Sequence, residues 1–250
     1  MKKLLLVAAS AMLFAGSANA QVRFAPEVGF NISKLHYNTD FDVADDWNLD
    51  EKSFTGIRAG VAVDICLANH LTLQPGIYYS RKGGERLFTF WNNRPVVTPF
   101  TDNVILGNNH VIADGSTIQE RVVLSYIEIP LLLNYYFDAG PGRIFIGAGP
   151  TFSFGVNGDL HLEIDQPNNG VHDLDNEYDL DFGDDGLLRG SDIGIMANVG
   201  YDFDFGLFVR PFYNWGLSNL SHQDRFDNID IHNRTFGVGF GWWFGGKNKN

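Results

Sequence analysis

The stretch Leu124–Phe137, LSYIEIPLLLNYYF, decides the fold. Its apolar residues recur at every second position from Ile127 to Phe137, while the positions between them include Glu128 and Asn134. A period of two places successive side chains on opposite faces of an extended strand. The stretch therefore predicts a strand that separates an apolar environment from a polar one.

Seven further segments show the same alternation, and their connections differ in length. Three connections are short, at about residues 68–70, 138–142 and 204–206, whereas the other four are long. Short turns at one end and long loops at the other are typical of outer-membrane barrels, whose short turns face the periplasm. The sequence predicts an all-β fold, an eight-stranded antiparallel up-and-down transmembrane β-barrel. The predicted strands are Val22–Ile32, Thr55–Leu67, Leu71–Arg81, Arg121–Phe137, Arg143–Val156, Ser191–Phe203, Leu207–Leu217 and Arg234–Phe244.

The first twenty residues have the features of a secretory signal. Two lysines precede the apolar run Leu4–Ala15, and Ala18-Asn19-Ala20 provides a cleavage site of small residues. No later stretch is long and apolar enough to cross a bilayer as a helix. We expect residues 1–20 to be a signal peptide for the Sec pathway and residues 21–250 to be an outer-membrane β-barrel domain.

Charge and composition exclude some classes of function. The formal net charge is −12 at pH 7, and nucleic-acid binding needs a basic surface, so nucleic acid is not an expected partner. The mean hydropathy is only −0.11, which a barrel allows because one face of each strand meets lipid. Cys66 is the single cysteine, so no intrachain disulfide can form.

The polar faces of the predicted strands carry both arginines and carboxylates. An arginine or lysine that faces lipid near the bilayer midplane costs about 2–4 kcal/mol, so these faces are expected to point into the barrel. There the opposite charges can pair, and side chains can fill the narrow interior of an eight-stranded barrel. We expect a plugged lumen, with an open polar pore as the alternative. The predicted ion-pair network comprises Arg23, Glu27, Arg58, Asp64, Glu128, Arg143, Asp192 and Arg210.

The connection after the fifth predicted strand contains a run of acidic residues. Their spacing supplies oxygen ligands of the kind that calcium prefers, although the glycine and the final glutamate of an EF-hand loop are missing. Two interpretations stay open, a surface Ca²⁺ site and a solvated acidic loop. No other cofactor is expected. The candidate ligands are Asp173, Asp175, Glu177, Asp179 and Asp181.

Two stretches resemble the PorT family of outer-membrane β-barrels, which is related in architecture to the small OmpA-like and OmpX-like barrels. They are Leu124–Phe137, quoted above, and Gly56–Gly84, GIRAGVAVDICLANHLTLQPGIYYSRKGG. Weaker matches are Gly147–Gly155 and Ser191–Phe203. The proline inside an apolar strand makes the first stretch the most specific. The resemblance implies an integral outer-membrane location and, because the founding member is associated with protein secretion, an accessory role in secretion as one alternative.

Catalytic motifs do not emerge from the sequence. All seven histidines fall outside the predicted strands, no two have the spacing of HExxH, and there is no GxSxG motif. We therefore expect no enzyme. The expected function is a structural or interaction role in the envelope, with small-solute transport or secretion as alternatives. Expected partners are outer-membrane lipid and lipopolysaccharide, which acidic loops can bridge through divalent cations, the barrel-assembly machinery, and other envelope or secretion proteins.

Overall fold

The computed structural model describes residues 22–39, 50–89, 115–165, 174–183, 186–221 and 229–245. All elements in these ranges are strands. No helix in them is long and apolar enough to cross a membrane. The strands are β1 (Val22–Thr39), β2 (Asp50–Ala68), β3 (Leu71–Thr89), β4 (Thr117–Asp138), β5 (Gly142–Asp165), β6 (Leu174–Asp179), β7 (Ser191–Phe203), β8 (Leu207–Gly216), β9 (Ile229–Trp242) and β10 (Phe244–Gly245).

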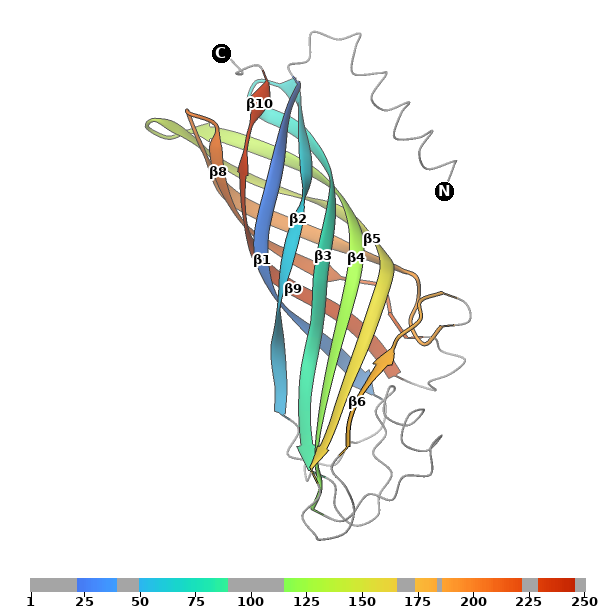
Figure 1. Cartoon of the computed structure of the whole chain (residues 1–250). Helices are drawn as coiled ribbons and strands as arrows, with labels where there is room; N and C mark the ends of the chain where they lie inside the picture. Colours follow the sequence, from blue (N-terminus) through green and yellow to red (C-terminus); the bar gives the residue numbers. More distant parts are fainter. Residues whose placement is uncertain are drawn as a thin grey trace.

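Eight of these strands form a closed antiparallel ring (Figure 1). The hydrogen-bonded order is β1, β2, β3, β4, β5, β7, β8, β9, and β9 pairs again with β1. Phe30 of β1 lies opposite both Ile57 of β2 and Val238 of β9, which marks the closure. β10 follows β9 after a break at Trp243 and also pairs with β1. The predicted eight-stranded up-and-down barrel is confirmed.

The short connections gather at one end of the barrel, which we call the turn end. They join β2 to β3, β4 to β5 and β7 to β8. Gly140 and Gly206 adopt φ values of 63° and 107°, a left-handed conformation that glycine takes without steric cost, and His70 adopts φ 66°. The long connections leave from the opposite end, the loop end, so the connections alternate between the two ends as the topology requires.

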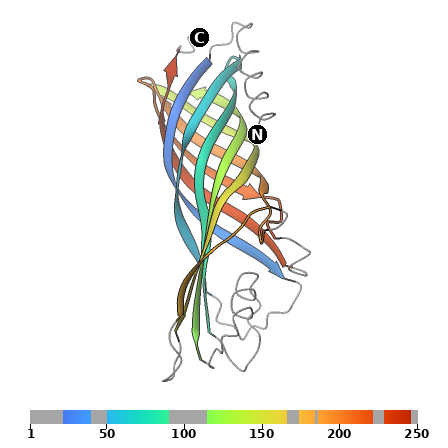
Figure 2. The same ribbon diagram turned by 45° about the vertical axis from the view of Figure 1, so that its right-hand side comes forward.

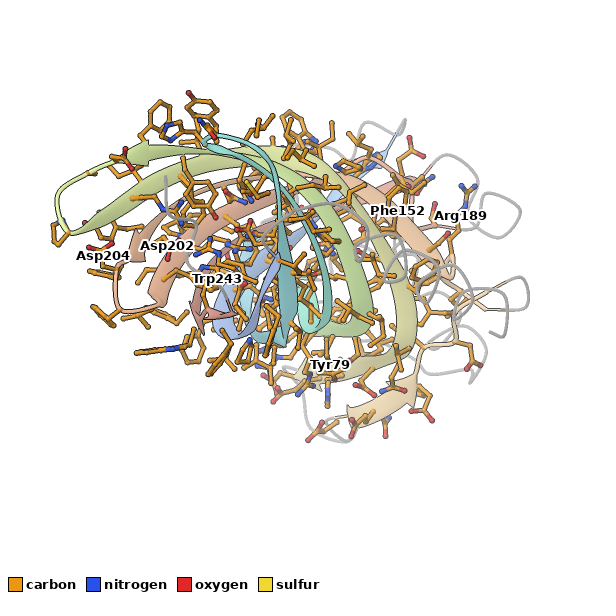
Figure 3. All side chains as sticks on the ribbon, turned by 90° about the horizontal axis from the view of Figure 1, so that it is seen from above. Tyr79, Phe152, Arg189, Asp202, Asp204 and Trp243 are labelled. Carbon is orange, nitrogen blue, oxygen red and sulfur yellow. The ribbon has the colours of Figure 1, made fainter. Side chains whose placement is uncertain are left out.

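A band of apolar side chains surrounds the barrel between its two ends. On β1 it runs from Val22 to Ile32 at alternate positions. Within it Val28 and Phe30 are 62% and 65% exposed, whereas the neighbouring Glu27 and Asn31 are 2% and 0% exposed. Seen from above, side chains fill the inside of the ring (Figure 3). The barrel is thus apolar outside and largely polar inside over this band.

The strands of one wall continue past the band at the loop end, where β3, β4, β5 and β6 project beyond the tips of β7, β8 and β9 (Figure 2). The predicted boundaries are wrong here: β4 begins at Thr117 rather than Arg121, and β5 ends at Asp165 rather than Val156. The polarity of the barrel reverses in this extension, because most of the inward side chains of β4 and β5 there are apolar. The predicted strands therefore end where the apolar outer face ends, short of the true strand ends.

The extension also contains a strand that the sequence analysis missed. β6 lies within the acidic run and pairs with the end of β5, with Asp175 opposite Glu163 and Asp179 opposite Asp159. Three histidines, expected outside strands, lie in the strand extensions. These are His36 in β1, His161 in β5 and His232 in β9.

Candidate functional site

The lumen holds the largest group of buried charges among the described residues. Glu27 on β1 lies near the centre of this group. One carboxylate oxygen of Glu27 accepts a hydrogen bond from Arg58 Nη1 at 3.0 Å. The other accepts one from the Tyr78 hydroxyl at 2.9 Å and lies 3.4 Å from Arg210 Nη1. All four side chains are almost completely buried. Glu27 therefore joins cations from β2 and β8, on either side of its own strand.

Glu128 on β4 continues this central ion cluster across the lumen. Its carboxylate accepts a hydrogen bond from Arg58 Nε at 3.2 Å and forms an ion pair with Lys82 of β3. The Arg58 guanidinium also lies over the Tyr78 ring, 3.3 Å from the ring centroid. The central ion cluster of Glu27, Arg58, Lys82, Glu128 and Arg210 thus links five strands. A fully buried charge needs such partners, because an unpaired one would be strongly destabilising.

A second cluster of ion pairs lies in the lumen near the turn end. Arg23 donates to Asp64 at 2.7 Å and to Asp202 at 3.0 Å, and Arg143 donates to the same oxygen of Asp202 at 3.0 Å. The Arg23 guanidinium lies 4.6 Å from the centroid of the Trp243 ring. In Figure 3 Asp202 and Trp243 lie on the same side of the barrel. Two aspartates and two arginines therefore neutralise one another at this level.

An apolar cluster fills the loop end of the lumen. Inward side chains of β1, β4, β5 and β9 meet buried leucines from the segments that follow β6 and β8. Phe182 packs edge-on against Tyr126, with ring centroids 5.6 Å apart, and a side chain at Gly155 would collide with the Phe182 ring. The segment is held by backbone hydrogen bonds, including Gly155 to Gly190 and Leu180 to Gly158. The buried members are Leu35, Val122, Leu124, Tyr126, Leu160, Leu180, Leu188, Leu220 and Ile231.

The eight residues of the predicted network all lie along the inner wall. Seven of them form the ion pairs described above. Asp192 is buried at the start of β7, but it has no ion pair with a described cation, and one of its carboxylate oxygens has no hydrogen-bond partner there.

Two members of these clusters were missed by the sequence analysis. Lys82 lies one residue past the predicted end of its strand at Arg81, so the boundary error excluded it. Asp202 lies inside a correctly bounded strand, and it has the same parity as the inward Asp192 and Asn198. Parity alone could therefore have found Asp202.

The proposed calcium ligands do not converge in the described part of the chain. Asp175, Glu177 and Asp179 project as exposed alternate side chains of β6, and Glu177 lies 3.4 Å from His161. Asp181 follows as an exposed residue, and Asp173 lies outside the described residues. No group of three or more histidine, cysteine or acidic side chains in the described ranges could hold a metal ion. The alternation that suggested ligand spacing is the period of a strand.

Residues 14–222, most of the sequence, match the model of a protein family described as "outer membrane protein beta-barrel domain". The chain belongs to this family. The family places the protein in the outer membrane and assigns the apolar band to contact with lipid. It fits a small barrel of the OmpA or OmpX kind without singling out the PorT family.

Several solved structures are similar to this chain. Neisserial surface protein A has 11% identity and a TM-score of 0.36, with 88% of this chain and 97% of that one covered. OprG from Pseudomonas aeruginosa has 11% identity and a TM-score of 0.42, with 91% and 98% covered. Ail from Yersinia pestis, in complex with the heparin analogue sucrose octasulfate, has 9% identity and a TM-score of 0.31, with 89% and 99% covered. No curated protein matches the sequence at a significant level.

Proposed function

We propose that this protein is a closed, non-enzymatic barrel of the outer membrane, with a structural or interaction role performed at its loop end rather than by transport through the lumen. The central ion cluster carries this proposal. It runs from Arg210 on β8 through Glu27 and Arg58 to Glu128 on β4, and so crosses the interior of the ring. The turn-end cluster and the apolar cluster lie on either side of it. Side chains can fill an eight-stranded barrel in this way and leave no path for solutes.

The orientation of the barrel is part of this proposal. The turn end faces the periplasm, and the loop end, with the projecting strands, faces the outside. Residues 1–20 direct export through the Sec pathway and are removed, so the intact mass of the envelope protein should correspond to a chain that begins at Gln21. Protease added to intact cells should cut at the loop end near Asp175 before any cut at the turn end.

Single-channel conductance of the refolded protein in planar bilayers tests the closed lumen. The wild-type protein should show no steady conductance steps. The double variant Glu27→Ala/Arg58→Ala removes the middle of the central ion cluster and should leak. Its matched control is Glu85→Ala/Arg121→Ala, which removes an ion pair whose Arg121 side chain is 45% exposed at the loop end, and it should stay closed. Steady conductance by the wild-type protein would overturn the closed-lumen proposal in favour of small-solute transport.

A role as an accessory component of protein secretion is supported by one observation, the PorT-like sequence of Leu124–Phe137. In that case the loop end or the turn end would hold a secretion component. Co-purification of the native protein under mild detergent distinguishes the two roles: a stable secretion partner favours the accessory role, and a barrel recovered alone favours the envelope role.

A further inference from the structure

The outer surface of β1 and β9 carries four basic side chains in two directly opposed pairs. Lys34 lies opposite Arg234, and His36 lies opposite His232. Opposed side chains have Cβ atoms about 5 Å apart, and successive outward positions on one strand lie about 7 Å apart. The four side chains, which we call the basic patch, therefore cover an area that one phosphorylated sugar could span.

The basic patch lies at the border of the lipid-facing band. Lys34 is the next outward residue after Ile32, and Arg234 is the next after Phe236, while Ile32 and Phe236 are both 49% exposed. Trp215 on β8 lies opposite Arg234, and the guanidinium is 5.1 Å from the centroid of its ring. Tryptophan is enriched at the level of lipid headgroups. The patch is thus at headgroup level at the loop end.

The described part of the chain does not neutralise the two cations of the patch, Lys34 and Arg234. Like charges directly opposite one another destabilise a pair of strands. Among the described residues no carboxylate lies within ion-pair distance of Lys34 or Arg234, and Arg234 Nε has no hydrogen-bond acceptor. The acidic residue on the same face of β9, Asp230, instead accepts a hydrogen bond from Asn219. In the lumen, by contrast, Arg23 and Arg58 each have two carboxylate partners. The described part of the chain therefore supplies no anion to these two opposed cations.

We propose that the basic patch binds the phosphate of a phosphorylated outer-leaflet lipid, of the lipopolysaccharide class. Arg234 offers a planar fork of donors that matches phosphate oxygens, and Lys34 supplies a second charge. The acyl chains of the same molecule then lie on the adjoining apolar band, along Ile32 and Phe236. A free phosphate ion would contact the basic patch but not the apolar band. The proposal rests on the orientation given above, in which the loop end faces outward.

Binding of lipid A to the full-length protein in detergent, followed by native mass spectrometry, tests this site. The probes are diphosphorylated lipid A, chemically dephosphorylated lipid A and inorganic phosphate. The test variant is Lys34→Gln/Arg234→Gln. The matched control is Lys52→Gln/Arg121→Gln, which removes the same charge from exposed positions on β2 and β4 at the loop end. Heat-modifiable migration on a gel shows that each variant is folded.

Diphosphorylated lipid A should bind the wild-type protein and the control equally, and the test variant at least tenfold more weakly. Dephosphorylated lipid A should bind all three proteins equally weakly. Equal binding of diphosphorylated lipid A to the test variant and the control would overturn the site. Inorganic phosphate that competes fully with lipid A at millimolar concentration would overturn the lipid assignment. The closed lumen is measured separately by conductance, so the two proposals can fail independently.

Discussion

The lipid-facing band and the loop-end extension are built from the same strands, yet their polarity is opposite. On β4 the band has Ile127 outside and Glu128 inside, whereas the extension has Arg121 outside and Leu124 inside. The same strands, with the same inward-facing side, run through both regions. The change in polarity therefore comes from the surroundings of the barrel wall, which are lipid at the band and water at the extension. Lipid selects an apolar exterior and leaves charges to pair within, while water selects a polar exterior and an apolar core.

The largest expected effect comes from the polar interior of the band. Glu128→Ala removes the partner of both Lys82 and Arg58 and leaves buried positive charge, which should lower the free energy of unfolding by about 3–5 kcal/mol. Urea unfolding in lipid vesicles, followed by tryptophan fluorescence, measures it. The control Glu163→Ala changes an exposed residue of the extension and should be nearly neutral. Equal stability of the two variants would mean that the central ion cluster does not hold the barrel together.

An arginine on the outer surface tests the inversion directly. Val28→Arg places a charge against lipid in the middle of the band and should cost about 2–4 kcal/mol. Gln119→Arg makes an outward change on β4 in the extension, opposite Glu163, and should change stability by less than about 0.5 kcal/mol. The two variants are compared by their refolding yield into lipid vesicles and by the midpoints of their urea unfolding. A similar cost at both positions would contradict a water-exposed extension.

The apolar cluster predicts a smaller, local effect. Leu188 is fully buried, and Leu188→Ala should cost about 2–3 kcal/mol through lost burial and a residual cavity. Because the residue lies in a connecting segment, the loss should appear as faster proteolysis at the loop end with conductance still absent. Leu217→Ala, at a position 51% exposed, is the control and should keep the wild-type rate. Leakage in Leu188→Ala would instead show that the apolar cluster, and not the central ion cluster, closes the lumen.

The smallest effect is expected at the turn end. Arg143 is 20% exposed at its side chain, and Asp202 keeps Arg23 as a partner when Arg143 is removed. Arg143→Ala should therefore lower stability by only about 1 kcal/mol. Urea unfolding should show a small shift of the midpoint that shrinks further in high salt, because a partly exposed pair is screened. A loss as large as that of Glu128→Ala would mean that water does not reach this pair.

The band was predictable from the sequence because alternation and lipid contact reinforce one another there. The extension was harder to predict, and β5 shows why. Its apolar residues occupy even positions on both sides of a register shift, yet Phe152 and Phe154 are 40% and 39% exposed, whereas Leu160 and Leu162 are 0% and 3% exposed. An extra residue in β5 at the register shift turns the apolar face from the outside to the inside. The local sequence does not predict that reversal.

The candidate site was predictable in kind but not in its partners. Parity placed the charged residues on the inner wall, but which charges meet depends on strand tilt and side-chain length across the ring. Arg58 therefore reaches Glu27 and Glu128, while Asp192 meets no described cation. The acidic run left two interpretations open because a period of two suits both alternate ligands and a strand, and the strand became evident only from the pairing of β6 with β5.

The height of the apolar band has a consequence for the membrane around the barrel. From Val22 to Ile32 the band follows about 33 Å of strand, which at a tilt of about 40° corresponds to about 25 Å along the bilayer normal. Charged residues border it at Lys34, so the barrel cannot slide to match a thicker hydrocarbon layer without burying cations. Lipids around it must instead compress, at a cost that grows with the mismatch. The protein should therefore concentrate where the membrane is already thin, and in synthetic bilayers it should insert fastest into the short-chain ones.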